Sequence, residues 1–162
     1  MTNKTEPLKA SAVGINHVAL EVGNIDEALA FYSRFLVFEI QDKNDTQAFI
    51  YFGDQFVNFM KHSNRKPDEK RHFGLAVDDK ELVRRSLEEM GVMLLGGPFL
   101  DFLDPWGNRV EITTYTNIQY TKADHILRGM GLGHLRKTEQ ALAKLRAKGM
   151  ASGNEASCNK KS

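Results

Sequence analysis

Apolar and polar positions along the chain follow one order of elements twice. Residues 14–22 alternate as a β-strand does, and residues 25–36 carry apolar side chains at the spacing of an amphipathic helix. Further strands are predicted at 37–42, 47–52 and 55–61. The last two are separated by Gly53-Asp54, which is typical of a tight hairpin turn. The first half therefore reads as strand, helix and three strands.

The same order begins again at residue 71. A strand at 71–77 is followed by a helical stripe that ends at Gly91, a residue suited to a left-handed C-terminal cap. Short strands are predicted at 92–95, 98–103 and 108–115. Asn24 with Glu27, and the run 78–81, have the form of capping boxes at the two helix starts.

Single positions support an internal repeat. His17 and His72 are 55 residues apart, and the pairs Leu20 with Leu75 and Val22 with Val77 keep that offset. The sequence thus predicts an α+β fold of two tandem βαβββ modules, 13–62 and 71–116, that form one domain. A flexible lead-in at 1–12 precedes the modules. After them, residues 117–148 are a predicted C-terminal helical extension, and residues 149–162 a predicted disordered tail.

Composition restricts the class of protein. The single cysteine, Cys158, excludes a disulfide framework, and the longest apolar runs fall short of a membrane span. The start of the chain lacks the apolar core of a secretory signal, so we expect a cytoplasmic protein. Residues 1–121 carry a net charge of −5 and residues 122–162 one of +6. We expect the basic extension to dock on the acidic body, and no nucleic-acid partner, because no aromatic-interleaved basic patch is present.

Two histidines and a glutamate are the candidate metal ligands. Strand alternation places His17 and His72 on faces with small neighbours, and Glu111 on a polar face of the last strand. Two imidazoles and one carboxylate suit one divalent ion of Fe, Mn, Ni, Co or Zn, and three ligands leave positions open for a substrate. The alternative is two histidines bonded to backbone carbonyls and a surface glutamate.

The chain resembles the vicinal oxygen chelate superfamily, which includes glyoxalase I, type I extradiol dioxygenases and bleomycin-resistance proteins. The resemblance covers residues 13–116 and rests on the segments INHVALEV, AFYSRFL, YFGDQFVNF, RHFGLAVDD and DPWGNRVEI. It implies that the paired modules form a curved mixed sheet with a central cleft. It also implies a metal held by His17, His72 and Glu111.

Two departures from the family pattern concern the site. Glyoxalase I has a further Glu or Gln ligand on the fourth strand, where this chain offers Asn58, which is as well explained by hydrogen bonds within the sheet. Extradiol dioxygenases tend to have a tyrosine ten residues before the metal glutamate, where this chain has Asp101. Asp101, or Glu111 if it leaves the metal, is the candidate catalytic base; the alternative for Asp101 is a solvent-facing charge at a sheet edge.

The sequence therefore favours a divalent-metal-dependent enzyme that chelates a small oxygen-bearing substrate and acts by Lewis-acid catalysis. Lyase or isomerase chemistry is favoured over ring cleavage, because the dioxygenase tyrosine is missing. The alternative is a metal-free protein that sequesters a small molecule, of the bleomycin-resistance type. Open sheet edges favour a homodimer. We expect a more open cleft, or one closed by the C-terminal helix or by a second chain.

Overall fold

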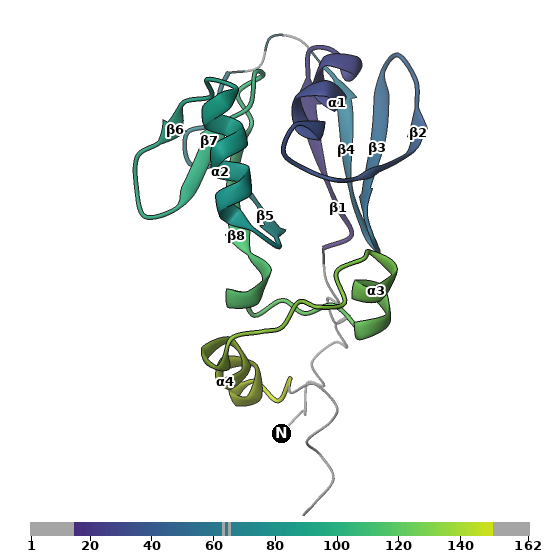
Figure 1. The fold of residues 1–162 in the computed structure, drawn as a ribbon. Helices are drawn as coiled ribbons and strands as arrows, with labels where there is room; N and C mark the ends of the chain where they lie inside the picture. Colours follow the sequence, from purple (N-terminus) through teal and green to yellow (C-terminus); the bar gives the residue numbers. More distant parts are fainter. Residues whose placement is uncertain (1–14, 63, 65, 151–162) are drawn as a thin grey trace, which may run out of the picture.

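A computed structural model describes residues 15–62, 64 and 66–150 (Figure 1). The first module consists of β1 (His17–Val22), α1 (Ile25–Ser33), β2 (Glu39–Lys43), β3 (Gln47–Phe52) and β4 (Gln55–Lys61). The second consists of β5 (Phe73–Val77), α2 (Lys80–Glu89), β6 (Leu94–Leu95), β7 (Leu100–Leu103) and β8 (Arg109–Thr114). A 3₁₀ turn η1 (Tyr115–Asn117) and helices α3 (Asp124–Gly129) and α4 (Glu139–Ala147) follow. The α+β class with tandem modules and C-terminal helices is confirmed, while the predicted lead-in 1–12 and the tail beyond residue 150 lie outside the described residues.

The eight strands form two four-stranded sheets with matching topology. Their orders are β1-β4-β3-β2 and β5-β8-β7-β6. In each sheet the first strand pairs in parallel with the last, and the other pairs are antiparallel. The sheets are separate within the chain rather than parts of one curved sheet, because α1 lies between them.

Local sequence signals account for where the helices begin and end. The Asn24 side chain accepts a hydrogen bond from the backbone N–H of Glu27 (3.1 Å) and caps α1. Asp79 caps α2 by accepting from the N–H groups of Glu81 and Leu82. Gly91 follows α2 at φ +69°, a left-handed conformation that glycine adopts without strain. The predicted start of α1 is confirmed, and α2 begins one residue later than a capping box over 78–81 implies, because Asp79 and not Asp78 is its N-cap.

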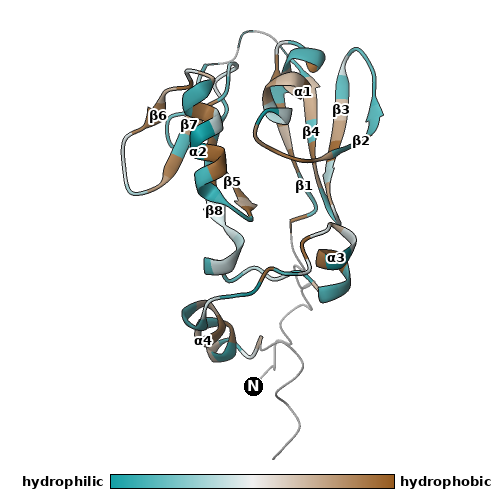
Figure 2. Cartoon of the chain, in the orientation of Figure 1, coloured by the Kyte–Doolittle hydropathy of each residue, from teal (hydrophilic) through white to brown (hydrophobic). Residues whose placement is uncertain are grey.

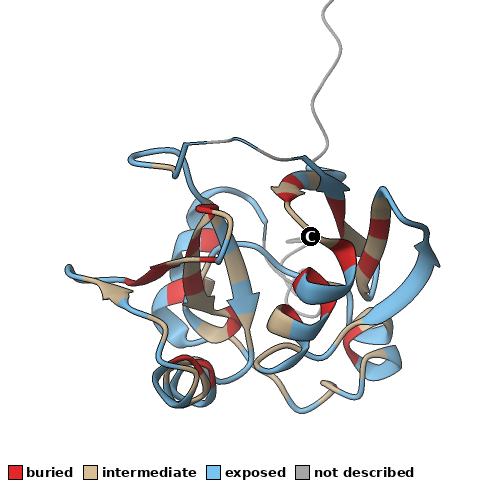
Figure 3. Ribbon diagram, turned by 90° about the horizontal axis from the view of Figure 1, so that it is seen from above, coloured by how far each residue is buried: buried red, intermediate tan, exposed pale blue. Residues whose placement is uncertain are grey.

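Each helix covers one face of its sheet and leaves the other without a helix. Under α1 lie the buried side chains of Leu20, Val22, Val57 and Phe59; under α2 lie those of Leu100, Phe102, Val110 and Ile112. Strand β2, at the outer edge, is exposed along its length, and Ile40 is the one apolar residue among its five (Figures 2 and 3). The opposite faces carry the predicted site residues, so one face of each module is core and the other is open.

Aromatic side chains of α1 and of the turn after it join the two modules. The rings of Phe31 and Phe35 lie 6.3 and 5.6 Å from that of Phe102, and Phe31 also contacts Trp106 edge-on at 6.5 Å. Phe31 and Phe35 thus belong to the cores of both modules. Because the helix-bearing faces of both sheets meet in this shared core, the open faces turn outward, away from each other.

A buried polar network fixes the same junction. Asp104 Oδ2 accepts hydrogen bonds from the Tyr32 hydroxyl (3.0 Å) and from Asn108 Nδ2 (2.7 Å). Asn108 Nδ2 also donates to the carbonyl of Glu21 at the end of β1 (2.9 Å). Tyr32, Asp104 and Asn108 are exposed by only 1%, 3% and 1%. Burial raises the pKa of Asp104, although its hydrogen bonds oppose that rise, and burial raises the pKa of Tyr32 well above its ordinary value.

The C-terminal extension joins the modules at their other end (Figure 1). The chain leaves β8 and passes under the first sheet, where the Tyr120 hydroxyl donates to Gln55 (2.8 Å) and Lys122 forms an ion pair with Asp54. Helix α4 returns to η1 through the bond from Thr138 N to the carbonyl of Thr116 (2.9 Å). None of the helices in the described part of the chain is long and apolar enough to cross a membrane.

We expect Tyr32→Phe to lower the free energy of unfolding by about 1.5–3 kcal/mol, because it removes a donor to a buried carboxylate. Tyr120→Phe is the matched control, since it removes a hydroxyl with an exposed partner, and a change below about 0.5 kcal/mol is expected. Urea unfolding followed by the fluorescence of Trp106, the single tryptophan, measures both. Equal effects of the two substitutions would contradict the role of the buried network.

The raised pKa of Asp104 has a consequence for stability against pH. Between the pKa of the unfolded carboxyl, about 4, and the higher folded value, the folded state binds more protons. Stability from this group is therefore complete below about pH 4 and declines as the pH rises through the folded pKa. In urea unfolding from about pH 4 to 7, we expect the wild type to lose stability relative to Asp104→Asn, which does not titrate. A constant difference would show that Asp104 titrates alike in both states.

Candidate functional site

The open face of the second module brings two of the predicted metal ligands together. His72 immediately precedes β5, and the parallel register pairs Gly74 with Glu111, so His72 and Glu111 project from the same face. His72 Nε2 lies 3.7 Å from Glu111 Oε2. The geometry thus gives an imidazole and a carboxylate on neighbouring strands, close enough to bind one ion.

A backbone hydrogen bond orients His72. Its Nδ1 lies 3.0 Å from the carbonyl oxygen of Lys70, and because a carbonyl can only accept, Nδ1 carries the proton in the neutral ring. The lone pair is then on Nε2, the atom next to Glu111. Metal-binding histidines in proteins typically donate their second nitrogen in this way.

His17 has the matching arrangement on the open face of the first module. Its Nδ1 lies 2.7 Å from the side-chain oxygen of Asn16, which leaves the lone pair on Nε2. The imidazole stacks on the ring of Phe56, its register partner on β4, with centroids 4.8 Å apart. His17 is exposed and is not next to His72 or Glu111, because the two open faces turn outward.

The internal repeat identifies a fourth residue of interest. In the first module Ala19 pairs with Asn58, and in the second Gly74 pairs with Glu111. Ala19 and Gly74 are 55 residues apart, the offset of the repeat, so Asn58 occupies the position that Glu111 occupies in the second module. Asn58 is 8% exposed, and its Oδ1 has no hydrogen-bond partner among the described residues. An amide therefore stands where the other module has a carboxylate.

Asp101 faces the same side as Glu111 and is buried. The antiparallel register pairs the two residues directly, which settles the parity that the sequence left open. Asp101 is 4% exposed, and its Oδ2 accepts hydrogen bonds from Nε (3.1 Å) and Nη2 of Arg109. Its Oδ1 has no hydrogen-bond partner in the described part of the chain. The alternative of a solvent-facing edge charge does not fit this position.

Arg109 is a site residue that the sequence reasoning missed. Its Nη1 donates to the carbonyl of Glu69 (2.7 Å), so the guanidinium is fixed between a loop and Asp101. Strand alternation offered a signal, since Arg109 precedes Glu111 by two positions and shares its face. The partner needed to interpret it, Asp101, lies on another strand.

The donor set fits a divalent transition metal, but one chain does not assemble it. Within residues 15–62, 64 and 66–150, no group of three His, Cys, Asp or Glu side chains is close enough to hold a metal ion. The chemistry of His72, Glu111 and His17, with both histidines anchored through Nδ1, is that of an N,N,O ligand set. The convergence of all three at one ion stays a prediction that needs a second chain.

Comparisons with known proteins agree with this architecture. The profile of the Glyoxalase/Bleomycin resistance protein/Dioxygenase superfamily matches residues 14–112. No match is found among curated proteins. A protein from the mobile metagenome of V. Pseudocholerae is 22% identical, with 68% of this chain and 100% of that chain covered and a TM-score of 0.54.

Two further solved structures have the same fold. A putative glyoxalase family protein from Bacillus anthracis is 21% identical, with 66% of this chain and 98% of that chain covered and a TM-score of 0.54. A mutant of the genomically encoded fosfomycin resistance protein FosX from Listeria monocytogenes is 15% identical, with 63% of this chain and 92% of that chain covered and a TM-score of 0.55. That structure holds Mn(II) and 1S,2S-dihydroxypropylphosphonic acid. At these identities the likeness concerns the fold alone.

Proposed function

The chain belongs to the Glyoxalase/Bleomycin resistance protein/Dioxygenase superfamily, and within it we propose a divalent-metal-dependent enzyme of the glyoxalase or dioxygenase type. Its substrate is a small molecule that presents two oxygens to the metal. The ligands are His17, His72 and Glu111, and the ion is Fe, Mn, Ni, Co or Zn. Lyase or isomerase chemistry is favoured, because Asp101 stands where the dioxygenases have a tyrosine.

The observation that carries this proposal is the matched orientation of the two histidines. Both sit at equivalent repeat positions, both have an oxygen acceptor within hydrogen-bond distance of Nδ1, and both leave the Nε2 lone pair on an open face. Histidines with a purely structural role would not need this shared orientation, and His72 would not need the Glu111 carboxylate 3.7 Å from its Nε2. The arrangement is typical of a ligand set held ready for an ion.

We further propose that two copies of the chain build each site. His17 of one protomer would lie beside a second protomer's His72 and Glu111, when the open face of the first module meets the open face of the second. The exposed Ala19 and Gly74 next to the histidines leave room for that approach. A two-fold dimer would then contain two equivalent sites.

The metal would act as a Lewis acid that stabilises negative charge developing on a substrate oxygen. The chain's own residues hold and move the proton. The guanidinium of Arg109 orients Asp101. Of the two carboxylate oxygens of Asp101, it bonds only to Oδ2, so Oδ1 is the atom that would accept a substrate proton. Glu111, on the adjacent strand, would take this role only after leaving the metal.

A metal-free small-molecule sequestering protein is the second candidate. It is favoured by the cluster of partly exposed aromatic rings around Phe56 on the open face of the first module. Such a surface can bind a ligand without any ion. Metal content separates the two candidates.

A mixed dimer tests both the ligand set and its division between chains. We expect His17→Ala and His72→Ala each to abolish metal binding as homodimers. A purified heterodimer of the two variants should regain one ion per dimer, because one of its two sites then has all three ligands. Elemental analysis after preparation without chelator measures this, and light scattering checks for two chains per particle.

Other outcomes of that experiment are informative. A heterodimer without metal, beside a wild type with one ion per chain, would show that each site lies within one chain. A wild type that takes up no Fe, Mn, Ni, Co or Zn would favour the sequestering protein. Phe99→Leu, an exposed position on the β6–β7 loop, is the control and should keep the metal.

Asp101→Asn tests the catalytic base. We expect it to leave the metal content unchanged and to lower turnover by about 10²–10⁴-fold, because the amide keeps the shape of the carboxylate and cannot accept a proton. Thermal unfolding monitors the lost pairing with Arg109. Full activity of this variant with any turned-over substrate would reduce Asp101 to a structural partner of Arg109.

A further inference from the structure

We infer that the two open faces bind a ligand with a flat aromatic group, hydrogen-bond donors and no negative charge. This inference rests on the proposed function in taking these faces as the binding site and in the two copies that bring the faces together, and it concerns the protein without a metal. Three independent features of the faces lead to it: ring stacking, unpartnered acceptors and charge.

The first feature is a cluster of four rings on the open face of β1, β4 and β3. Phe56 is at its centre, stacked on His17 at 4.8 Å and on Tyr51 at 5.1 Å, with interplanar angles of 11° and 23°. Phe49 contacts Phe56 at 5.7 Å and an angle of 61°. None of the four is fully buried, so the cluster presents aromatic surface outside the core. Aromatic groups and cations are the partners that such surfaces favour.

The second feature is a pair of buried acceptors that lack donors within the described residues. Asn58 Oδ1 lies on the face of the ring cluster, and Asp101 Oδ1 lies on the open face of the second module. Both residues are more than nine-tenths buried. A buried acceptor without a partner is costly, and a ligand that donates N–H or O–H groups would remove that cost. A ligand made of acceptors alone would leave both oxygens unsatisfied.

The third feature is the sign of the charge. The registers place Glu39 and Asp42 on the open face of the first sheet. On the second they place Asp101 and Glu111 with Arg109, whose charge is matched by Asp101. Among the described strand residues of the two faces, Arg109 is the only lysine or arginine. These faces therefore disfavour an anion and favour a neutral or cationic ligand.

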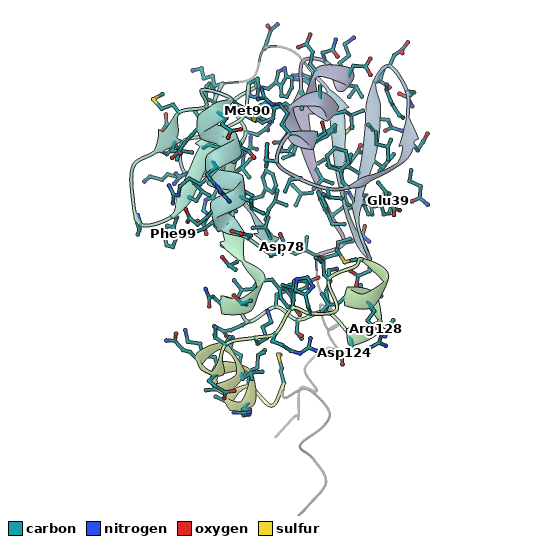
Figure 4. All side chains as sticks on the ribbon, in the orientation of Figure 1. Glu39, Asp78, Met90, Phe99, Asp124 and Arg128 are labelled. Carbon is teal, nitrogen blue, oxygen red and sulfur yellow. The ribbon has the colours of Figure 1, made fainter. Side chains whose placement is uncertain are left out.

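A hollow beside the ring cluster is consistent with this charge. It has a volume of about 350 Å³ and is lined by Tyr51, Glu39, Ile40, Gln41 and Gly53. Figure 4 shows Glu39 on the outer flank of the first module and Phe99 on the opposite flank of the molecule. A positively charged group of a ligand stacked on the cluster would reach the Glu39 carboxylate there.

Three matched probes test the inference with the full chain. Benzylammonium carries ring, donors and positive charge; benzoate reverses the charge; cyclohexylmethylammonium lacks the aromatic ring. We expect chelator-treated protein at about pH 7 to bind benzylammonium at least about 10-fold more tightly than benzoate, and about 2–10-fold more tightly than cyclohexylmethylammonium. NMR chemical-shift titration measures all three affinities.

Substitutions locate the binding. Phe56→Leu and Asn58→Ala should each weaken benzylammonium binding by about fivefold, whereas Phe99→Leu should not change it. Benzoate binding equal to or tighter than that of benzylammonium would overturn the inference, and so would unchanged affinity in both Phe56→Leu and Asn58→Ala. If those variants fail to fold, the affinities of the wild type for benzylammonium, benzoate and cyclohexylmethylammonium still test the inference. Metal content of untreated protein decides the proposed function separately, because none of these preferences requires an ion.

Discussion

The contact between α1 and the second module sets the geometry of the whole chain. Phe31 and Phe35 supply the apolar part of this contact, and the Tyr32 hydroxyl supplies the polar part through buried Asp104. Phe31, Tyr32 and Phe35, in α1 and its C-terminal turn, contact both modules. Helix α1 can therefore cover the first sheet only while it also lies against the second module. The outward direction of the open faces, and with it the separation of His17 from His72, follows from this one constraint.

Local sequence patterns were sufficient to predict the helices and strands. They did not predict how the two modules pack against each other. The hairpin at Gly53 and the cap at Asn24 depend on residues near in sequence, and both are found. The second cap lies within the predicted run 78–81, at Asp79. The helix predicted to residue 36 ends at Ser33, because the following residues form a tighter turn with bonds to Phe31 and Tyr32 carbonyls. The division into two sheets depends on packing between Phe35 and Phe102, which no local pattern encodes.

The candidate site was predictable to a similar extent. Alternation placed Glu111 on a polar face and left the facing of Asp101 open, and the registers bring both to the face of His72. The pairing of Asp101 with Arg109, and the unsatisfied oxygen of Asn58, emerge only when strands are aligned side by side. The repeat relates residues of the two modules. They share one backbone arrangement, and the same position holds the carboxylate of Glu111 in the second module and the amide of Asn58 in the first.

The extension has a consequence for how the molecule comes apart. The Asp104 network joins the modules at one end, and the contacts of Tyr120 and Lys122 with the β3–β4 hairpin join them at the other (Figure 1). A module that opened alone would expose the aromatic core it shares and break both junctions at once. The two halves, although each is a complete repeat, are therefore coupled, and we expect them to unfold together in one transition.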